Sequence, residues 1–168
     1  MTTATTISVE EYLRTSYDGL DREYRDGEVI ERGMPTNEHS LAQGNLIYFF
    51  TFHRNRLRLY PRPELRLRLS VKLIRIPDVC LFKDAPPTES VPTSPPYIAI
   101  EILSPDDKMT QVIEKLDEYA TWGVTHIWFV DLFHKKLFTY AKRELHEVPQ
   151  FQLTDPNFTV MPQDIFTE

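Results

Sequence analysis

Residues 97–103 read Tyr-Ile-Ala-Ile-Glu-Ile-Leu, and residues 74–82 read Ile-Arg-Ile-Pro-Asp-Val-Cys-Leu-Phe. Both runs are apolar enough to be buried strands, yet each carries a carboxylate, Glu101 in the first and Asp78 in the second. An ionised group buried without a partner is normally neutralised or paired with a cation, and two such groups on neighbouring strands repel each other. A bound Mg²⁺ would offset both the burial of the charges and their mutual repulsion, because it takes one or two protein carboxylates and completes its shell with water and substrate phosphates. A structural alternative is that Asp78 merely follows a proline at a strand entry and that Glu101 pairs with an arginine.

An ordered set of short motifs surrounds these carboxylates. The set consists of Asp26-Gly27-Glu28, Glu38-His39, Pro77-Asp78, Glu101-Ile102-Leu103-Ser104-Pro105, Lys115 with Tyr119, Gly123-Val124 and Trp128-Phe129-Val130-Asp131. It spans about residues 7–145 and resembles the Uma-type family of restriction endonuclease-like proteins, within the PD-(D/E)XK nuclease superfamily. The resemblance implies an α/β (α+β) fold with a restriction-endonuclease-like core, in which helices flank a mixed central sheet, preceded by an N-terminal helix and β-hairpin. It also implies a Mg²⁺-dependent endonuclease acting on DNA, with Mn²⁺ as an alternative cofactor and Asp78 and Glu101 as metal ligands.

One position departs from the superfamily pattern. Leu103 stands two residues after Glu101, where the pattern has a lysine. Lys115 is the expected replacement, because residues 107–122 have the spacing of an amphipathic helix and Lys115 flanks its apolar face beside Tyr119. A lysine paired along the helix surface is the alternative.

Glu28 and His39 complete the expected catalytic set. The Asp26-Gly27 pair predicts a hairpin whose returning strand begins at Glu28. The resemblance makes Glu28 a third acidic group and metal ligand, although a strand-edge carboxylate is the alternative. His39 opens a long helical segment, where a capping or packing role competes with an active-site role.

Charge is distributed unevenly along the chain. The net charge of −6 argues against avid nonspecific binding to nucleic acid. Residues 54–75, however, carry eight basic side chains against one acidic side chain, Glu64. Strand alternation from Leu65 to Leu73 predicts that Arg66, Arg68 and Lys72 share one face and form a nucleic-acid-binding strip. A solvated strand face is the alternative.

The 168 residues suit one domain, 1–168, without a signal peptide or membrane span, so a cytoplasmic protein is expected. The aromatic segment Tyr48-Phe49-Phe50-Thr51-Phe52 predicts either a buried helix or a homodimer surface. Further elements are expected as helices at 8–17 and 39–55 and strands near 57–60, 64–73, 77–82, 97–103, 126–132 and 136–142. Because Leu103 replaces the motif lysine, a catalytically decayed nuclease scaffold that binds nucleic acid or protein is the alternative function.

Overall fold

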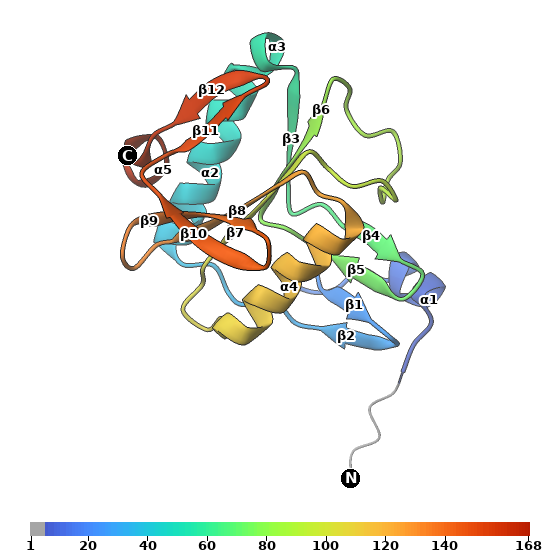
Figure 1. Cartoon of the computed structure of the whole chain (residues 1–168). Helices are drawn as coiled ribbons and strands as arrows, with labels where there is room; N and C mark the ends of the chain where they lie inside the picture. The colour runs from blue at the N-terminus through green and yellow to red at the C-terminus, as the bar shows by residue number, and fades with distance from the viewer. Residues whose placement is uncertain (1–5) are drawn as a thin grey trace.

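A six-stranded mixed sheet forms the centre of the computed structural model, which describes residues 6–168 (Figure 1). Its strands are β3 (Leu59–Pro63), β6 (Val79–Lys83), β7 (Ile98–Ile102), β8 (His126–Asp131), β9 (Lys136–Ala141) and β10 (Glu144–Val148). They lie in the order β10-β9-β8-β7-β6-β3. Only β7 and β8 run parallel to each other, and the other neighbouring pairs are antiparallel. The expected mixed central sheet is therefore confirmed.

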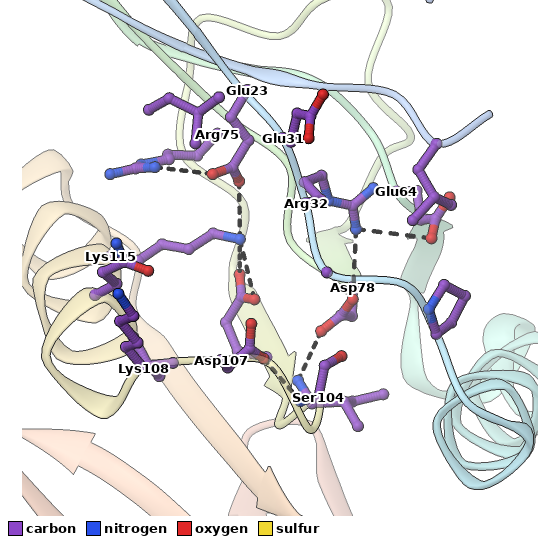
Figure 2. Close-up of a pocket in the computed structure, with 18 of the residues that line it drawn as sticks. Glu23, Glu31, Arg32, Glu64, Arg75, Asp78, Ser104, Asp107, Lys108 and Lys115 are labelled. Atoms are coloured by element: carbon purple, nitrogen blue, oxygen red, sulfur yellow. Dashed lines mark hydrogen bonds and ion pairs between the residues drawn. The ribbon is translucent and has the colours of Figure 1, made fainter. Parts of the chain in front are cut away.

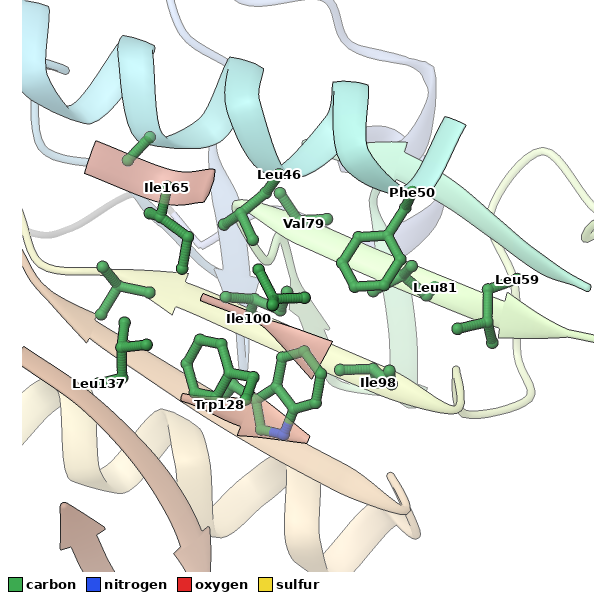
Figure 3. Close-up of a cluster of buried hydrophobic side chains, with 14 of the residues drawn as sticks. Leu46, Phe50, Leu59, Val79, Leu81, Ile98, Ile100, Trp128, Leu137 and Ile165 are labelled. Atoms are coloured by element: carbon green, nitrogen blue, oxygen red, sulfur yellow. The ribbon is translucent and has the colours of Figure 1, made fainter. Parts of the chain in front are cut away.

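Helices cover both faces of this sheet. Helix α2 (Asn37–Phe52) packs Leu46 and Phe50 onto one face, and helix α4 (Met109–Trp122) packs on the other (Figure 3). Successive residues of a strand point to opposite faces, so the isoleucines of β7 at 98, 100 and 102 join the α2 side. Glu101 consequently faces the α4 side.

A four-stranded antiparallel sheet lies beside the central one. It contains β1 (Glu23–Arg25), β2 (Glu28–Ile30), β4 (Leu67–Ser70) and β5 (Leu73–Arg75), in the order β2-β1-β5-β4. Asp26 and Gly27 form the predicted hairpin turn with positive φ values of 48° and 94°. Helix α1 (Val9–Arg14) covers this sheet, and its N-cap Ser8 accepts a hydrogen bond from the Glu11 N–H.

Proline 77 marks the point where the chain crosses from the small sheet to the central sheet. The β5 strand ends at Arg75 and β6 begins at Val79. Because proline has no N–H to donate, the ladder is interrupted between these strands. The two sheets therefore meet around Asp78.

The segment expected to be one strand at 64–73 is a hairpin. The β4 strand ends at Ser70, a turn follows, and β5 begins at Leu73 with a register irregularity between Arg68 and Ser70. The hydrophobic alternation continues through the turn, and the sequence pattern therefore gives no sign that the strand is interrupted there.

The C-terminal elements were not anticipated from the sequence. They are β10, β11 (Phe151–Thr154), β12 (Asn157–Val160) and α5 (Pro162–Phe166), and a short helix, α3 (Arg54–Leu57), follows α2. The Phe151 ring stacks on Trp128 with centroids 4.3 Å apart, which seals the α2 side of the core. None of the helices within residues 6–168 combines the length and apolar character needed to cross a bilayer.

Candidate active site

Asp78 and Glu101 lie opposite each other across β6 and β7. Val79 pairs with Ile100 in that ladder, so the next pair in the same register is Asp78 and Glu101. Both side chains are buried. Asp78 Oδ2 accepts a 2.7 Å hydrogen bond from the Ile102 N–H, which fixes the carboxylate against the neighbouring strand.

Lys115 of α4 reaches the carboxylates, as expected. Its Nζ lies 2.8 Å from Glu23 Oε1, 3.0 Å from Glu101 Oε1 and 3.1 Å from the Ile76 carbonyl oxygen (Figure 2). An ammonium group has three N–H donors, so these three acceptors use all of them. Burial favours the neutral amine, but Glu101 and Glu23 outweigh burial and raise the pKa of Lys115. Lys115 is thus a buried cation that joins two carboxylates.

Glu101 is held from a second side by Tyr119. The Tyr119 hydroxyl donates a 2.7 Å hydrogen bond to Glu101 Oε1, and Tyr119 is fully buried. Burial raises the pKa of Glu101 to about 7, even though Lys115 lowers it, and repulsion from Asp78 acts in the same direction as burial. The site therefore holds a carboxylate that favours additional positive charge.

Glu23 of β1 is a site residue that the sequence analysis missed. It is 4% exposed and accepts hydrogen bonds of 2.8 Å from Arg75 and from the Ile76 N–H, besides the contact with Lys115. Burial alone would raise its pKa, but Lys115 and Arg75 outweigh burial and lower the pKa of Glu23 to about 2. Arg75 in turn holds Glu118 of α4 at 2.6 Å. The alternation of Glu23-Tyr24-Arg25 is the signal that could have indicated an inward-facing Glu23, since Tyr24 joins the core under α1.

Glu28 does not lie in this cluster. Although β1 and β2 place Glu23 opposite Ile30 and Arg25 opposite Glu28, Glu28 is at the hairpin tip, two residues or about 7 Å further along the strand. It is exposed and does not line the pocket. The expectation of Glu28 as a metal ligand and catalytic residue is therefore corrected, and Glu23 is the carboxylate that this hairpin contributes.

His39 and Arg32 approach Asp78 from the other side. His39 Nε2 lies 3.2 Å from Asp78 Oδ1, and Arg32 NH2 lies 3.5 Å from the same oxygen. Burial disfavours the charged imidazole, but the hydrogen bond and charge of Asp78 outweigh it and raise the pKa of His39. The structure thus brings His39 into the site, together with an arginine that the sequence analysis had not singled out.

These side chains line a pocket of about 170 Å³ at the junction of the two sheets. Asp78, Glu101, Lys115, Glu23, His39 and Arg32 all contribute to its lining, and Asp107 and Lys108 lie at the start of α4 beside them (Figure 2). Because these charged side chains line one pocket, a ligand that enters the pocket can contact them.

Two of the three residues of the predicted basic strip are paired with carboxylates. Arg66 is bound to Asp21 by hydrogen bonds of 2.5 and 2.6 Å, and its guanidinium stacks 4.5 Å from the centre of the Tyr12 ring. Its side chain is only 15% exposed. Lys72 lies in the turn after β4 and is paired with Asp26 at 3.4 Å, whereas Arg68 is on β4 itself. Arg66 therefore holds α1 to the small sheet, and the nucleic-acid-binding role of Arg66, Arg68 and Lys72 stays a prediction.

The donor chemistry of the pocket fits a magnesium ion. Within residues 6–168, no three or more histidine, cysteine, aspartate or glutamate side chains are arranged to hold a metal ion. Asp78 and Glu101 nevertheless supply two carboxylates, the number that Mg²⁺ commonly takes from a protein when water and phosphate oxygens complete its shell. Asp78 Oδ1 has only contacts of 3.2 Å or longer, so this oxygen is the one least engaged by the protein.

Comparison with known proteins places the chain in a family. A search of curated proteins found no match. Among solved structures, the fold is similar to a crystal structure from Anabaena variabilis, described as "a putative nuclease belonging to DUF820", with a TM-score of 0.81 and 21% sequence identity. The match covers 96% of this chain and 98% of that one. A family model described as "Putative restriction endonuclease" matches residues 9–165, and the chain therefore belongs to the Uma2 family.

Proposed function

We propose that the protein is a Mg²⁺-dependent endonuclease that hydrolyses phosphodiester bonds in DNA. Membership of the Uma2 family supports an enzyme acting on nucleic acids. The observation that carries the proposal is the facing pair of buried carboxylates, Asp78 and Glu101, with a buried lysine beside them. A hydrolase acting on a phosphodiester needs hard oxygen ligands and compensating positive charge in the same place.

Asp78 and Glu101 would hold Mg²⁺, with Mn²⁺ as an alternative. A metal ion bound there would polarise the phosphate and lower the pKa of a bound water. Other residues of the chain hold these two metal ligands in place. The Ile102 N–H and His39 orient Asp78. Tyr119 and Lys115 orient Glu101. Because all three N–H donors of Lys115 are already used, we assign Lys115 the role of positioning Glu101 rather than of contacting water.

Cleavage assays with point variants of the metal ligands test this function. Purified protein is incubated with plasmid and oligonucleotide DNA in Mg²⁺, in Mn²⁺ and in EDTA. We expect cleavage in either metal and none in EDTA. Asp78→Asn and Glu101→Gln should each abolish cleavage while retaining the circular dichroism spectrum of the wild type. An Asp78→Asn protein that still cuts at the wild-type rate contradicts the assignment.

A second function is favoured by one specific observation. Leu103 leaves the strand without its lysine, and the oxygens of Asp78 and Glu101 already have cationic partners in Arg32, His39 and Lys115. A catalytically decayed scaffold that binds nucleic acid or protein would have this self-neutralised arrangement. Calorimetric titration of Mg²⁺ separates the two, because this alternative predicts DNA binding with neither metal binding nor turnover.

A further inference from the structure

We propose that Arg32 is a catalytic residue of this site, and that its guanidinium binds a nonbridging oxygen of the phosphodiester beside Asp78. The inference rests on the proposed nuclease function and adds to it a phosphate-contacting group. Arg32 lies in the segment that connects β2 to α2, lines the pocket and has a side chain that is 11% exposed. Figure 2 shows it approaching the carboxylates from the side opposite Lys115.

The contacts of Arg32 are longer than those of Arg75 and Arg66, whose side chains are also largely shielded from solvent. Arg75 is held at 2.6 and 2.8 Å by Glu118 and Glu23, and Arg66 is held at 2.5 Å by Asp21. These distances are as short as those of strong charge-assisted hydrogen bonds, or shorter than them. Arg32 NH2 lies 3.5 Å from Asp78 and 3.6 Å from Glu64. Arg75 and Arg66 are therefore structural, whereas Arg32 retains hydrogen-bonding capacity.

One terminal nitrogen of Arg32 has no hydrogen-bond partner in the described part of the chain. NH1 is buried and makes no hydrogen bond within residues 6–168. Leaving donors of a buried charged group unpaired is unfavourable, so such a group is normally satisfied by a ligand or water. A phosphodiester matches it well, because the planar guanidinium binds two oxygens of a phosphate side by side.

The ammonium group of Lys115 cannot supply this contact. Lys115 uses its three N–H donors on Glu23, Glu101 and the Ile76 carbonyl oxygen. Arg32 is adjacent to Asp78 and is held only by long contacts, so a small rotation presents both of its terminal nitrogens to a phosphate bound there. Negative charge that accumulates on that phosphate during hydrolysis would then be stabilised by Arg32.

The salt dependence of DNA binding tests this role independently of turnover. Binding of a fluorescein-labelled duplex is measured by anisotropy over a range of KCl concentrations, with Ca²⁺ in place of Mg²⁺. Each phosphate contact contributes about 0.9 to the slope of log K against log salt. We expect Arg32→Gln to lower the slope by about one and to weaken binding by about 10-fold or more. Arg143→Gln is the matched control, because Arg143 is 83% exposed and pairs with Asp117 outside the pocket.

Turnover and a charge-retaining variant complete the test. In Mg²⁺, Arg32→Gln should cut DNA about 100-fold more slowly, in line with the loss of one preorganised donor. Arg32→Lys keeps the charge without the planar fork and should keep the wild-type slope with intermediate turnover. If Arg32→Gln matches the wild type in salt slope and cleavage rate, Arg32 does not touch the phosphate, although the nuclease function stands. If the glutamine variant does not fold, the same comparison is made with Arg32→Lys. If the wild type binds DNA but cuts none, the nuclease function fails, and the slope still decides whether Arg32 contacts phosphate.

Discussion

Glu23 of β1 and Lys115 of α4 form a buried ion pair, 2.8 Å between Oε1 and Nζ, that ties the small sheet to the helix covering the central sheet. The pair connects directly to Glu101, since Lys115 also lies 3.0 Å from that carboxylate. The geometry of the pocket is therefore inseparable from the way the two sheets are held together.

Glu23 should make folding stability depend on acid pH. The folded-state pKa of about 2 lies below the ordinary value of 4.5, so the ionised form stabilises the folded state. This stability is fully present above pH 4.5 and is lost as the pH falls from 4.5 towards 2. We expect the free energy of unfolding of the wild type to exceed that of Glu23→Gln by about 3 kcal/mol at pH 7. Urea titrations at several pH values would contradict this origin if the difference stayed constant down to pH 2.

Lys115→Met should damage both stability and catalysis. The variant leaves Glu23 and Glu101 buried without their shared cation, which costs about 3–5 kcal/mol. Glu101 would also lose its orientation, so we expect cleavage to fall by about 100-fold or more. Lys136→Met is the control, because Lys136 forms a half-exposed pair with Glu147 on the central sheet's far strands. Unfolding and single-turnover cleavage are measured together, and normal cleavage by Lys115→Met would show that the lysine positions nothing.

Tyr119→Phe isolates one hydrogen bond to Glu101. The change removes a hydroxyl that donates at 2.7 Å in a fully buried place, and it preserves the ring. A hydrogen bond to a charged group contributes about 1.5–3 kcal/mol, so we expect destabilisation in that range and slower cleavage. Tyr97→Phe removes a 2.7 Å hydrogen bond to the Asp155 carbonyl oxygen in an exposed place and should have a smaller effect on both quantities. Equal effects in the two variants would argue against a special role for the Tyr119 hydroxyl.

The sequence predicted the pieces of this site whose signals are local. Asp78 and Glu101 were recognisable because each interrupts an apolar strand, and Lys115 followed from its position on an amphipathic helix. The alternation of Glu23-Tyr24-Arg25 is consistent with an inward-facing Glu23. It does not predict the ion pair with Lys115, because that contact depends on how the small sheet docks against α4. The resemblance to the Uma-type family predicts Glu28 instead, although the hairpin register leaves Glu28 at the exposed tip.

The same distinction explains the basic segment. Alternation of Arg66 and Arg68 with leucines was a correct indication of β4, but the partner of Arg66 is Asp21, which precedes it by 45 residues. Arg66→Gln should therefore lower the free energy of unfolding by about 2–4 kcal/mol and leave the salt slope of DNA binding unchanged. Chemical denaturation and anisotropy titration on the same preparation check this. A reduced salt slope in a fully folded Arg66→Gln protein would support the nucleic-acid-binding role.

The exposed aromatic pair on α2 allows the predicted homodimer to be tested. Phe50 is buried in the core, but Tyr48 and Phe52 are 69% and 71% exposed, and their rings lie 5.9 Å apart. Large aromatic side chains that remain in water favour association, because burying each one releases about 1.5–3 kcal/mol. If the chain is a dimer through this surface, the double variant Tyr48→Ser/Phe52→Ser should sediment as a monomer at concentrations where the wild type is dimeric. Phe133→Ser is the matched control, since Phe133 is 65% exposed in the turn after β8. A wild type that sediments as a monomer at all concentrations, or a double variant that stays dimeric, rules out this surface as the dimer contact.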